Sequence, residues 1–235
     1  NMSRRDLRFT VLAGFFLFLH FFSWYSAVKL TLVSHAAVLA SLHPLVVLFC
    51  TIFIFKRRVN VGQIISIFVA LLGASIVALL DSESGGVSAE NPLLGNLYAF
   101  IAGISMGIYF QLGNEARKNV TGSTYVFLCF LTCFISFAVA NLISGTALIG
   151  YPPMDYIYCL CLTILCQIGS HAIFNLCLGH VDSLYVSNWE TGDIVFSTII
   201  SLIMLGQFPG LWGVIGCIIT TLALIYYNIS TSKNA

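Results

Sequence analysis

Charged residues are scarce in this chain of 235 residues: Lys, Arg, Asp and Glu together make up 8% of it, against about 25% in a typical soluble domain. Apolar residues make up 59% and the mean hydropathy is +0.97, so an ordinary water-soluble domain is excluded. The net charge is only +1 and there is no basic tract, which argues against a nucleic acid partner. The apolar runs are continuous and do not alternate with polar residues, and this pattern predicts membrane helices instead of a membrane barrel.

Motifs of catalysis and metal binding are also scarce. The sequence has no HExxH zinc motif, no phosphate-binding loop and no CxxC pair. Its eight cysteines all fall in apolar runs, where a buried cysteine behaves as a small apolar residue. Cys129 and Cys133 are one helical turn apart, and a metal pair there is the less favoured alternative. We therefore expect no metal, no cofactor and no catalytic residues, and the protein is predicted not to be an enzyme.

Eight apolar runs are each long enough to cross about 30 Å of hydrocarbon, which takes roughly 20 helical residues. When they are threaded up and down through a membrane, nine of the ten Lys and Arg residues fall on one face and only Lys29 falls on the other. Loops rich in Lys and Arg face the cytoplasm, so this face is predicted to be cytoplasmic and the protein to be a multi-pass protein of the plasma (inner) membrane. The acidic loop with Asp81, Glu83 and Glu90 then lies outside. The eight runs are Phe9–Leu30, Ala36–Phe55, Ile64–Leu80, Leu94–Leu112, Tyr125–Leu148, Ile157–Leu178, Leu184–Leu205 and Leu211–Tyr227.

The longest polar connection, residues 81–92, divides the chain into two parts that have the same order of features. Residues 1–80 contain three predicted spans and residues 93–235 contain five. In the first part a short turn leads into a span with His43, and in the second a short turn leads into a span with Glu190. A polar turn and a glycine-containing span follow in both parts. Because each unit has an odd number of spans, three, the second copy has the opposite orientation in the membrane. Inverted repeats of this kind are typical of secondary transporters.

Several short motifs of small and apolar residues fit this repeated order. One group is Gly95-Asn96-Leu97, Ala99, Ala102-Gly103 and Tyr109. A second group is Tyr25-Ser26-Ala27, Ala36 to Leu42, Pro44-Leu45, Gln63 and Gly73, and a third is Val181 to Asp193, Leu205-Gly206-Gln207 and Gly213–Gly216. The first group resembles the first helix of an EamA repeat of the drug/metabolite transporter superfamily. The second and third groups resemble the third to fifth helices of that repeat in its two copies.

The resemblance implies an all-α fold of ten membrane helices in two inverted repeats, of which the first two helices are missing here. Residues 1–80 are then the last three helices of the first repeat, residues 81–92 an extracytoplasmic loop, and residues 93–235 the second repeat. The resemblance also implies a substrate site in a central cavity between the repeats and transport by alternating access. The chain departs from the family at the acidic position after the fourth helix, which is Arg57 in one copy and Gln207 in the other.

Glu190 and Asp193 are the strongest functional signal. At 1.5 Å per residue they lie about 10 and 14 Å deep in one predicted span, and their spacing of three places them on one helical face. Because charges at this depth are costly, the two carboxyl groups must face protein, water or a ligand. A carboxyl group that gains and loses a proton there would carry it across the membrane, so proton coupling is one hypothesis. The alternative is a structural contact to another helix, with Lys29 or His43 as the partner.

Other polar and aromatic residues inside predicted spans complete the candidate substrate-binding or coupling set. Gln167, His171 and Asn175 repeat every four residues and form a polar stripe. His43 precedes Pro44, and a broken helix near the middle of the membrane often marks a transporter site. For each residue the alternative is interhelical packing or hydrogen bonding. The full set is Glu190, Asp193, Trp189, His43, His171, Asn175, Gln167, His20, Trp24 and Tyr109.

We expect a secondary transporter that moves a small organic solute, with membrane lipid and protons as its other partners. Carboxylates beside aromatic rings favour a solute that bears an amine, such as an amino acid, because ring faces attract cations. The alternatives are a membrane enzyme that uses Cys or His on lipid-soluble substrates and a non-transporting scaffold. Small residues repeat every four positions at Gly95, Ala99, Gly103 and Gly107, which favours close helix packing, either within the chain or between the two copies of a homodimer.

Overall fold

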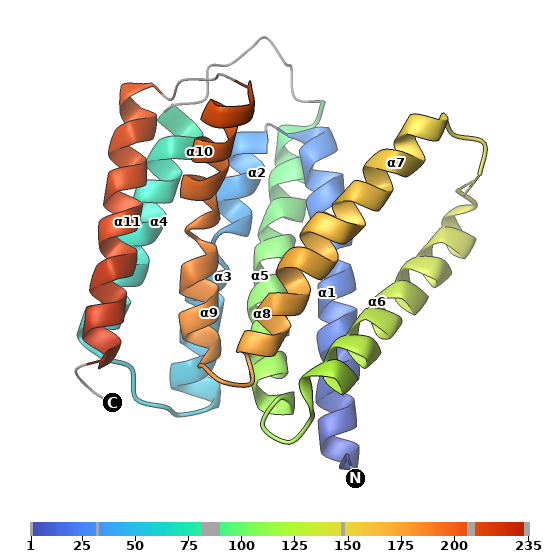
Figure 1. The fold of residues 1–235 in the computed structure, drawn as a ribbon, viewed down its shortest axis with the longest axis horizontal. Helices are drawn as coiled ribbons and strands as arrows, with labels where there is room; N and C mark the ends of the chain where they lie inside the picture. Colours follow the sequence, from blue (N-terminus) through green and yellow to red (C-terminus); the bar gives the residue numbers. More distant parts are fainter. Residues whose placement is uncertain (1, 32, 81–89, 147–148, 206–209, 233–235) are drawn as a thin grey trace.

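The protein is an all-helical bundle in the part of the chain that the structure, a computed structural model, describes. Figure 1 shows the helices running up and down beside one another. The predicted all-α fold is confirmed for these residues. Asp81, Glu83, Gly206 and Gln207, which were named above, lie outside them. The described residues are 2–31, 33–80, 90–146, 149–205 and 210–232.

Each of the eight apolar runs is helical over most of its length, and three of the helices are interrupted. The uninterrupted ones are α1 (Arg4–Leu30), α4 (Val61–Leu80), α5 (Pro92–Ala116), α6 (Gly122–Ser144) and α11 (Leu211–Ser232). The first interrupted one consists of α2 (Val33–Ala40), α3 (His43–Phe49) and the π-helix η1 (Cys50–Ile54). The others are α7 (Pro153–Leu162) with the π-helix η2 (Thr163–His171) and α8 (Ala172–Cys177), and α9 (Ser183–Glu190) with α10 (Asp193–Leu205).

Six helical stretches of the described chain are long and apolar enough to cross a membrane, and Val61–Val77 is a shorter apolar helix. The stretch formed by α9 and α10 is not among these six. Large apolar side chains are exposed on many of these helices, as expected for a chain surrounded by lipid. The protein is therefore an integral, multi-pass membrane protein.

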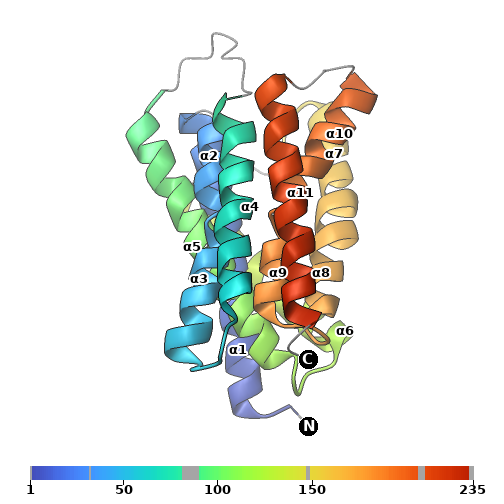
Figure 2. The same ribbon diagram turned by 90° about the vertical axis from the view of Figure 1, so that its left-hand side faces the viewer.

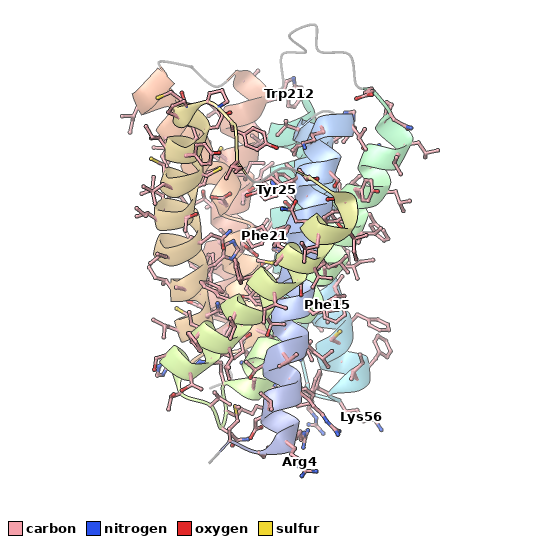
Figure 3. The ribbon with its side chains drawn as sticks, turned by 90° about the vertical axis from the view of Figure 1, so that its right-hand side faces the viewer. Arg4, Phe15, Phe21, Tyr25, Lys56 and Trp212 are labelled. Atoms are coloured by element: carbon pink, nitrogen blue, oxygen red, sulfur yellow. The ribbon has the colours of Figure 1, made fainter. Side chains whose placement is uncertain are left out.

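The bundle is built around α5, which packs against α1, α2, α3 and α9. On one side α4 and α11 pack along each other, as Figures 1 and 2 show. On the other side α6 and α7 slant away from the bundle (Figure 1). No residue of α7 is buried, and the buried residues described on α6 are Tyr125 and Cys129. Arg4 and Lys56 lie at one end of the molecule and Trp212 lies at the other (Figure 3). We call the first of these the basic end.

The small residues of α5 form a packing seam within the chain, as their spacing predicted. A Cβ atom added at Gly103 would lie 2.7 Å from the carbonyl oxygen of Leu39, and one added at Gly107 would lie 2.9 Å from that of His43. Only glycine allows the backbones of α2 and α3 to come this close to α5. Gly103, Ser105 and Gly107 also match the GxSxG pattern of serine hydrolases, but they lie inside a helix and not on the strand-to-helix turn which that chemistry requires.

Two helix breaks bring polar residues to the middle of the bundle. The first separates α2 from α3 at Ser41 and Leu42, directly before His43. Pro44 lies in the first turn of α3, where its missing N–H group is tolerated, whereas inside a continuous helix it would remove a hydrogen bond. The second break separates α9 from α10 at Thr191 and Gly192. Because α3 contacts α9, the two broken helices face each other.

The crossing of α4 and α11 gives a test of the packing. A Cβ atom at Gly73 would lie 2.7 Å from the backbone nitrogen of Thr220 and 2.9 Å from the carbonyl oxygen of Gly216. Gly73→Val should therefore push the two helices apart and lower the free energy of unfolding by about 1–3 kcal/mol, the usual cost of overpacking. Thermal unfolding of the purified protein measures this. Leu72→Val, at an exposed neighbouring position, should change stability by less than about 0.5 kcal/mol. Equal melting temperatures for the two variants would contradict the crossing.

Candidate functional site

His43 and Glu190 lie side by side where the two broken helices meet. Glu190 Oε2 is 2.9 Å from His43 Nε2, and Ser187 Oγ is 3.3 Å from His43 Nδ1. The side chain of His43 is 7% exposed and that of Glu190 is 18% exposed, and Ser187 is fully buried. Both ring nitrogens of His43 therefore contact α9. Of the two structural partners predicted for Glu190, the structure selects His43, whereas Lys29 is exposed near the end of α1.

Glu190 and Asp193 do not share a helical face, so that prediction is wrong. Glu190 is the last residue of α9 and Asp193 is the first residue of α10, with Thr191 and Gly192 between them. Glu190 is largely buried, whereas Asp193 is exposed. A carboxylate in the first turn of a helix is stabilised by the partial positive charge of the helix N-terminus. Asp193 occupies this position in α10, which gives it a structural role. Spacing of three predicts a shared face only in an unbroken helix.

The predicted histidines lie along a row of contacting rings that crosses the bundle. The ring centroids of His43 and Phe110 are 6.0 Å apart, and those of Phe110 and Phe174 are 6.3 Å apart. His171 continues the row, with its ring centroid 6.4 Å from that of Phe174 and 5.1 Å from that of Phe21. His20 ends the row, with its ring centroid 5.2 Å from that of Phe21. The row joins α3, α5, α8, η2 and α1, so residues far apart in the sequence share one interior region.

Two predicted site residues form a buried hydrogen bond between α5 and α8. The hydroxyl group of Tyr109 donates to Oδ1 of Asn175, and both residues are fully buried. His20 also contacts α5, because its Nδ1 atom lies 2.9 Å from the carbonyl oxygen of Ala102. These contacts fix the three side chains in place. They fit the interhelical hydrogen bonding that was the alternative to a site role.

The remaining predicted residues occupy different surroundings. Trp24 packs against a cluster of buried alanines from α1, α2 and α5. Trp189 packs against Ala70, Ala223 and Leu224 of α4 and α11, on another side of α9 from His43. Gln167 is partly buried on η2, whose π-helical hydrogen bonds run from i to i+5 and make its turns wider than those of an α-helix. The polar stripe of Gln167, His171 and Asn175 therefore runs along a distorted helix.

Buried polar groups without a hydrogen-bond partner gather around the second helix break. In the described part of the chain these include both amide atoms of Asn188, Nε1 of Trp189 and Oγ1 of Thr191. Oε2 of Glu190 is also without one, since its contact with His43 lacks the geometry of a hydrogen bond. Each buried group left unpaired costs about 1–3 kcal/mol. Four consecutive residues, Asn188 to Thr191, thus have buried polar atoms without a hydrogen-bond partner in the described chain. This concentration indicates a site where these atoms contact a bound molecule. Sequence reasoning missed Asn188 and Thr191, although both are polar residues beside Glu190 in an apolar span.

A second polar cluster lies at the basic end. The guanidinium group of Arg57, which follows η1, donates to the carboxylate of Glu115 and lies 3.3 Å from Oδ1 of Asp182. Lys118 Nζ is 2.7 and 2.8 Å from the two carboxylate oxygens of Glu115. Nδ2 of Asn114 donates to the carbonyl oxygens of Leu178 and Val181, both at 3.0 Å. The cluster connects η1, α5 and the turn between α8 and α9. Sequence reasoning missed it because its contacts, apart from that between Lys118 and Glu115, join residues more than fifty positions apart.

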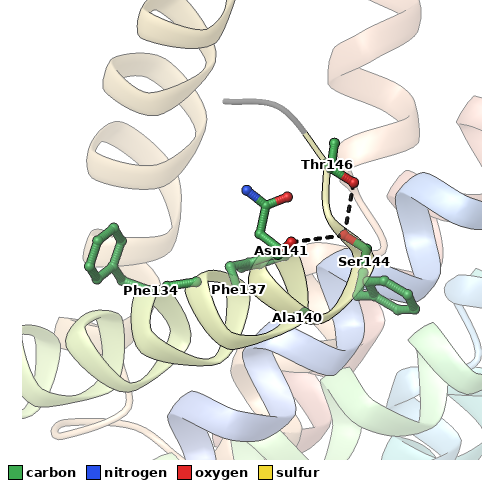
Figure 4. A pocket seen from close by; sticks show the side chains of 8 residues that line it. Phe134, Phe137, Ala140, Asn141, Ser144 and Thr146 are labelled. Carbon is green, nitrogen blue, oxygen red and sulfur yellow. Dashed lines mark hydrogen bonds between the residues drawn. The ribbon is translucent and has the colours of Figure 1, made fainter. Parts of the chain in front are cut away.

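Two pockets of similar size lie away from the His43–Glu190 contact. One, of about 550 Å³, is at the basic end beside Asn114, Lys118 and Asp182. The other, of about 540 Å³, is mostly apolar and lies between α1 and the far end of α6 (Figure 4). At its rim Ser144 Oγ lies 3.1 Å from the carbonyl oxygen of Asn141 and 2.8 Å from Thr146 Oγ1. Neither His43 nor Glu190 is among the described residues that line the two pockets.

Comparisons with known proteins agree with this architecture. Residues 1–79 match the EamA-like transporter family, and no curated protein matches the chain. A solved structure described only as "Crystal structure of protein" superposes with a TM-score of 0.76 at 16% sequence identity, over 98% of this chain and 88% of that one. At this identity the likeness shows the fold alone. The match over residues 1–79 includes His43 and the first helix break. It confirms the resemblance to an EamA-type protein of the drug/metabolite transporter superfamily. This family points to a membrane transporter and not to an enzyme.

Proposed function

We propose that the protein is a secondary transporter that moves a small organic solute through the membrane by alternating access. In this proposal residues 1–80 are the last three helices of one EamA-like repeat, and residues 93–235 are an inverted second repeat. The two helix breaks support it, because each lies in the middle helix of three that have the same order in the two parts. Broken helices whose ends meet near the middle of the membrane are typical of secondary transporter sites.

The contact of His43 with Glu190 is the observation that carries the proposal. Ionisable residues inside the membrane are costly to keep, and they commonly mark substrate or proton pathways. Here a carboxyl group and an imidazole from the two halves of the chain meet at the helix breaks, 2.9 Å apart. A solute with an amino group can take the place of the imidazole beside Glu190, and a proton bound to Glu190 can take the place of the solute. Binding of the solute or of a proton at Glu190 would in either case alter the contact between His43 and Glu190 that joins the two halves of the chain.

The basic end is the closed side of the transporter in this proposal. Lys- and Arg-rich loops face the cytoplasm, so this end is assigned to the cytoplasm. Arg57, Glu115 and Asp182 connect three segments there and hold the first half of the chain to the second. Between this cluster and the His43–Glu190 contact lies a buried hydrogen bond from the hydroxyl of Ser183 to Gln111. Opening toward the cytoplasm would require the ion pairs of Arg57 to separate.

Ligand-dependent stability of the purified full chain tests the function. A solute that binds only the folded state raises the melting temperature by mass action, and we expect a hit among amino acids and amines but not among sugars and nucleosides. Proteoliposomes should take up the same solute, and an imposed pH gradient should change the rate. If Glu190→Gln and Asp193→Asn both leave the response to the gradient unchanged, proton coupling is wrong. Absence of both stabilisation and uptake for every solute class would favour a non-transporting scaffold.

A further inference from the structure

Exposed cations gather at the basic end without a carboxylate partner among the described residues. They are Arg4, Arg5 and Arg8 on α1 and Lys56 shortly after η1, and we call them the basic patch. The described carboxylates of this end contact other groups. Asp6 caps its own helix. Glu115 and Asp182 both contact Arg57. The positive charge of the basic patch is therefore not neutralised by the described part of the protein.

The exposed face of α1 changes from cationic to apolar along its length. Arg4, Arg8 and Leu12 are four residues apart and therefore lie on one face, where all three are exposed. Phe15 follows about one turn later and is also exposed. Figure 3 shows Arg4 at the end of the helix and Phe15 further along it, toward the middle of the molecule. This order matches that of a phospholipid in a membrane, whose charged headgroup lies outside its acyl chains.

The segment around η1 has the same order. Phe49 and Phe53 are exposed and their ring centroids are 4.8 Å apart, and Lys56 comes three residues after Phe53. Figure 3 shows Lys56 at the same end of the molecule as Arg4. A soluble anion could contact only the cations of these two segments. A molecule with a phosphate group and acyl chains could contact the cations and the exposed apolar side chains together.

Lys56 also has an unusual backbone conformation. Its φ is 52°, and in the described part of the chain no other residue except glycine has a positive φ. The N–H group of Arg57 donates to the carbonyl oxygen of Thr51 at 2.9 Å, so the chain turns back at Lys56 as it leaves the helix. Glycine usually occupies such a position, because a side chain makes this conformation costly. A lysine there keeps a cation at the surface despite the strain, and either the negative end of the helix or an anionic ligand can explain it.

We propose that the basic patch binds the phosphate groups of anionic phospholipids in the membrane leaflet at the basic end. The exposed leucine and phenylalanine side chains beside the patch then contact the acyl chains of the same lipids. Each cation near an anionic membrane surface strengthens binding about fivefold. The proposal is independent of the transported solute, because none of these residues lies at the two helix breaks.

Lipid binding to the purified full chain tests the proposal. The melting temperature is followed while phosphatidylglycerol, or phosphatidylcholine with the same acyl chains, is added to the protein in detergent, since a ligand of the folded state raises it. Phosphatidylglycerol should act at a concentration roughly 10- to 100-fold lower, because several cations contribute. Added salt should reduce this difference, because it screens exposed charges. Equal potency of the two lipids would overturn the proposal. Equal stabilisation by glycerol phosphate, which has no acyl chains, would show a site for a soluble anion and would also overturn it.

Substitutions locate the site. Arg8→Gln and Lys56→Gly should each bind phosphatidylglycerol about fivefold more weakly, with little change for phosphatidylcholine. Lys29→Gln is the matched control, because Lys29 is an exposed cation near the opposite end of the helix that carries Arg8, and this variant should bind both lipids normally. Unchanged affinity in Arg8→Gln and Lys56→Gly, or an equal loss in Lys29→Gln, would overturn the proposal.

The stability of Lys56→Gly without lipid separates the two explanations for this lysine. If Lys56 is kept for lipid binding, the variant should melt at or above the temperature of the unmodified protein, because glycine adopts the backbone conformation without strain. A lower melting temperature, together with normal affinity for phosphatidylglycerol, would show that the charge of Lys56 only stabilises the end of its helix. That result would remove Lys56 from the basic patch and overturn the proposal.

Discussion

Glu190→Gln is expected to reduce solute uptake by roughly 10- to 100-fold while the protein remains folded. Glutamine keeps the shape of the side chain and removes its charge. A hydrogen bond to a charged group contributes about 1.5–3 kcal/mol, and each 1.4 kcal/mol is about a factor of ten in an equilibrium constant. Initial rates in proteoliposomes measure the effect. Glu90→Gln is the same chemical change at an exposed residue before α5 and should leave uptake unchanged.

Stability measurements separate a transport role of this contact from a purely structural one. His43→Leu leaves the largely buried carboxyl group of Glu190 without its imidazole, and leaving a buried polar group without its partner typically costs about 1–3 kcal/mol. The double variant His43→Leu with Glu190→Leu should recover most of that stability, because replacing a buried pair with apolar residues is often neutral. We expect the double variant to be folded and inactive. Uptake at the normal rate by the double variant would show that the contact only joins the two helices.

Glu115→Gln is expected to open the basic end. Glu115 is 9% exposed and accepts from both Arg57 and Lys118, so the loss of its charge removes the central member of the cluster. Arg57 then keeps its contacts with Asp182, which is largely exposed, and with Asn114. Exposed ion pairs contribute little to stability. The equilibrium between the closed and open states of the basic end should therefore shift roughly tenfold toward the open state. Arg57→Gln should have the same effect.

Labelling of an introduced thiol measures this opening. Ser183 is 1% exposed and lies just inside the cluster, so the thiol introduced by Ser183→Cys reports access from the basic end. A membrane-impermeant maleimide added on that side should label it about tenfold faster in the Glu115→Gln and Arg57→Gln backgrounds. Arg58→Gln is the matched control, because Arg58 is exposed and the described residues include no ion pair for it. Equal labelling rates in all four proteins would show that Arg57 does not close this end.

The sequence by itself determined the class of protein and marked Glu190 as a candidate site residue. Every helix that crosses the hydrocarbon core of a membrane needs apolar side chains over about 30 Å, so a run of about 20 apolar residues is sufficient evidence for a span. The same requirement makes a carboxylate in such a run conspicuous, because its burial is costly whatever its partner is. Pro44 likewise marked the first helix break in the sequence, because a proline cannot donate the hydrogen bond that a continuous helix needs.

Only the tertiary structure decided which residues meet. Sequence spacing gives the depth and face of a residue on its own helix, but not the residue that lies opposite on another helix. Which residues meet depends on how far the helices are shifted along each other. Small residues set this shift, such as Gly103 of α5, which packs against the end of α2 next to the first helix break. The packing places His43 beside Glu190, joins Arg57 to Glu115, and leaves the amide of Asn188 without a partner among the described residues. The break at Gly192 separated Asp193 from Glu190, because helical periodicity is lost where the helix stops.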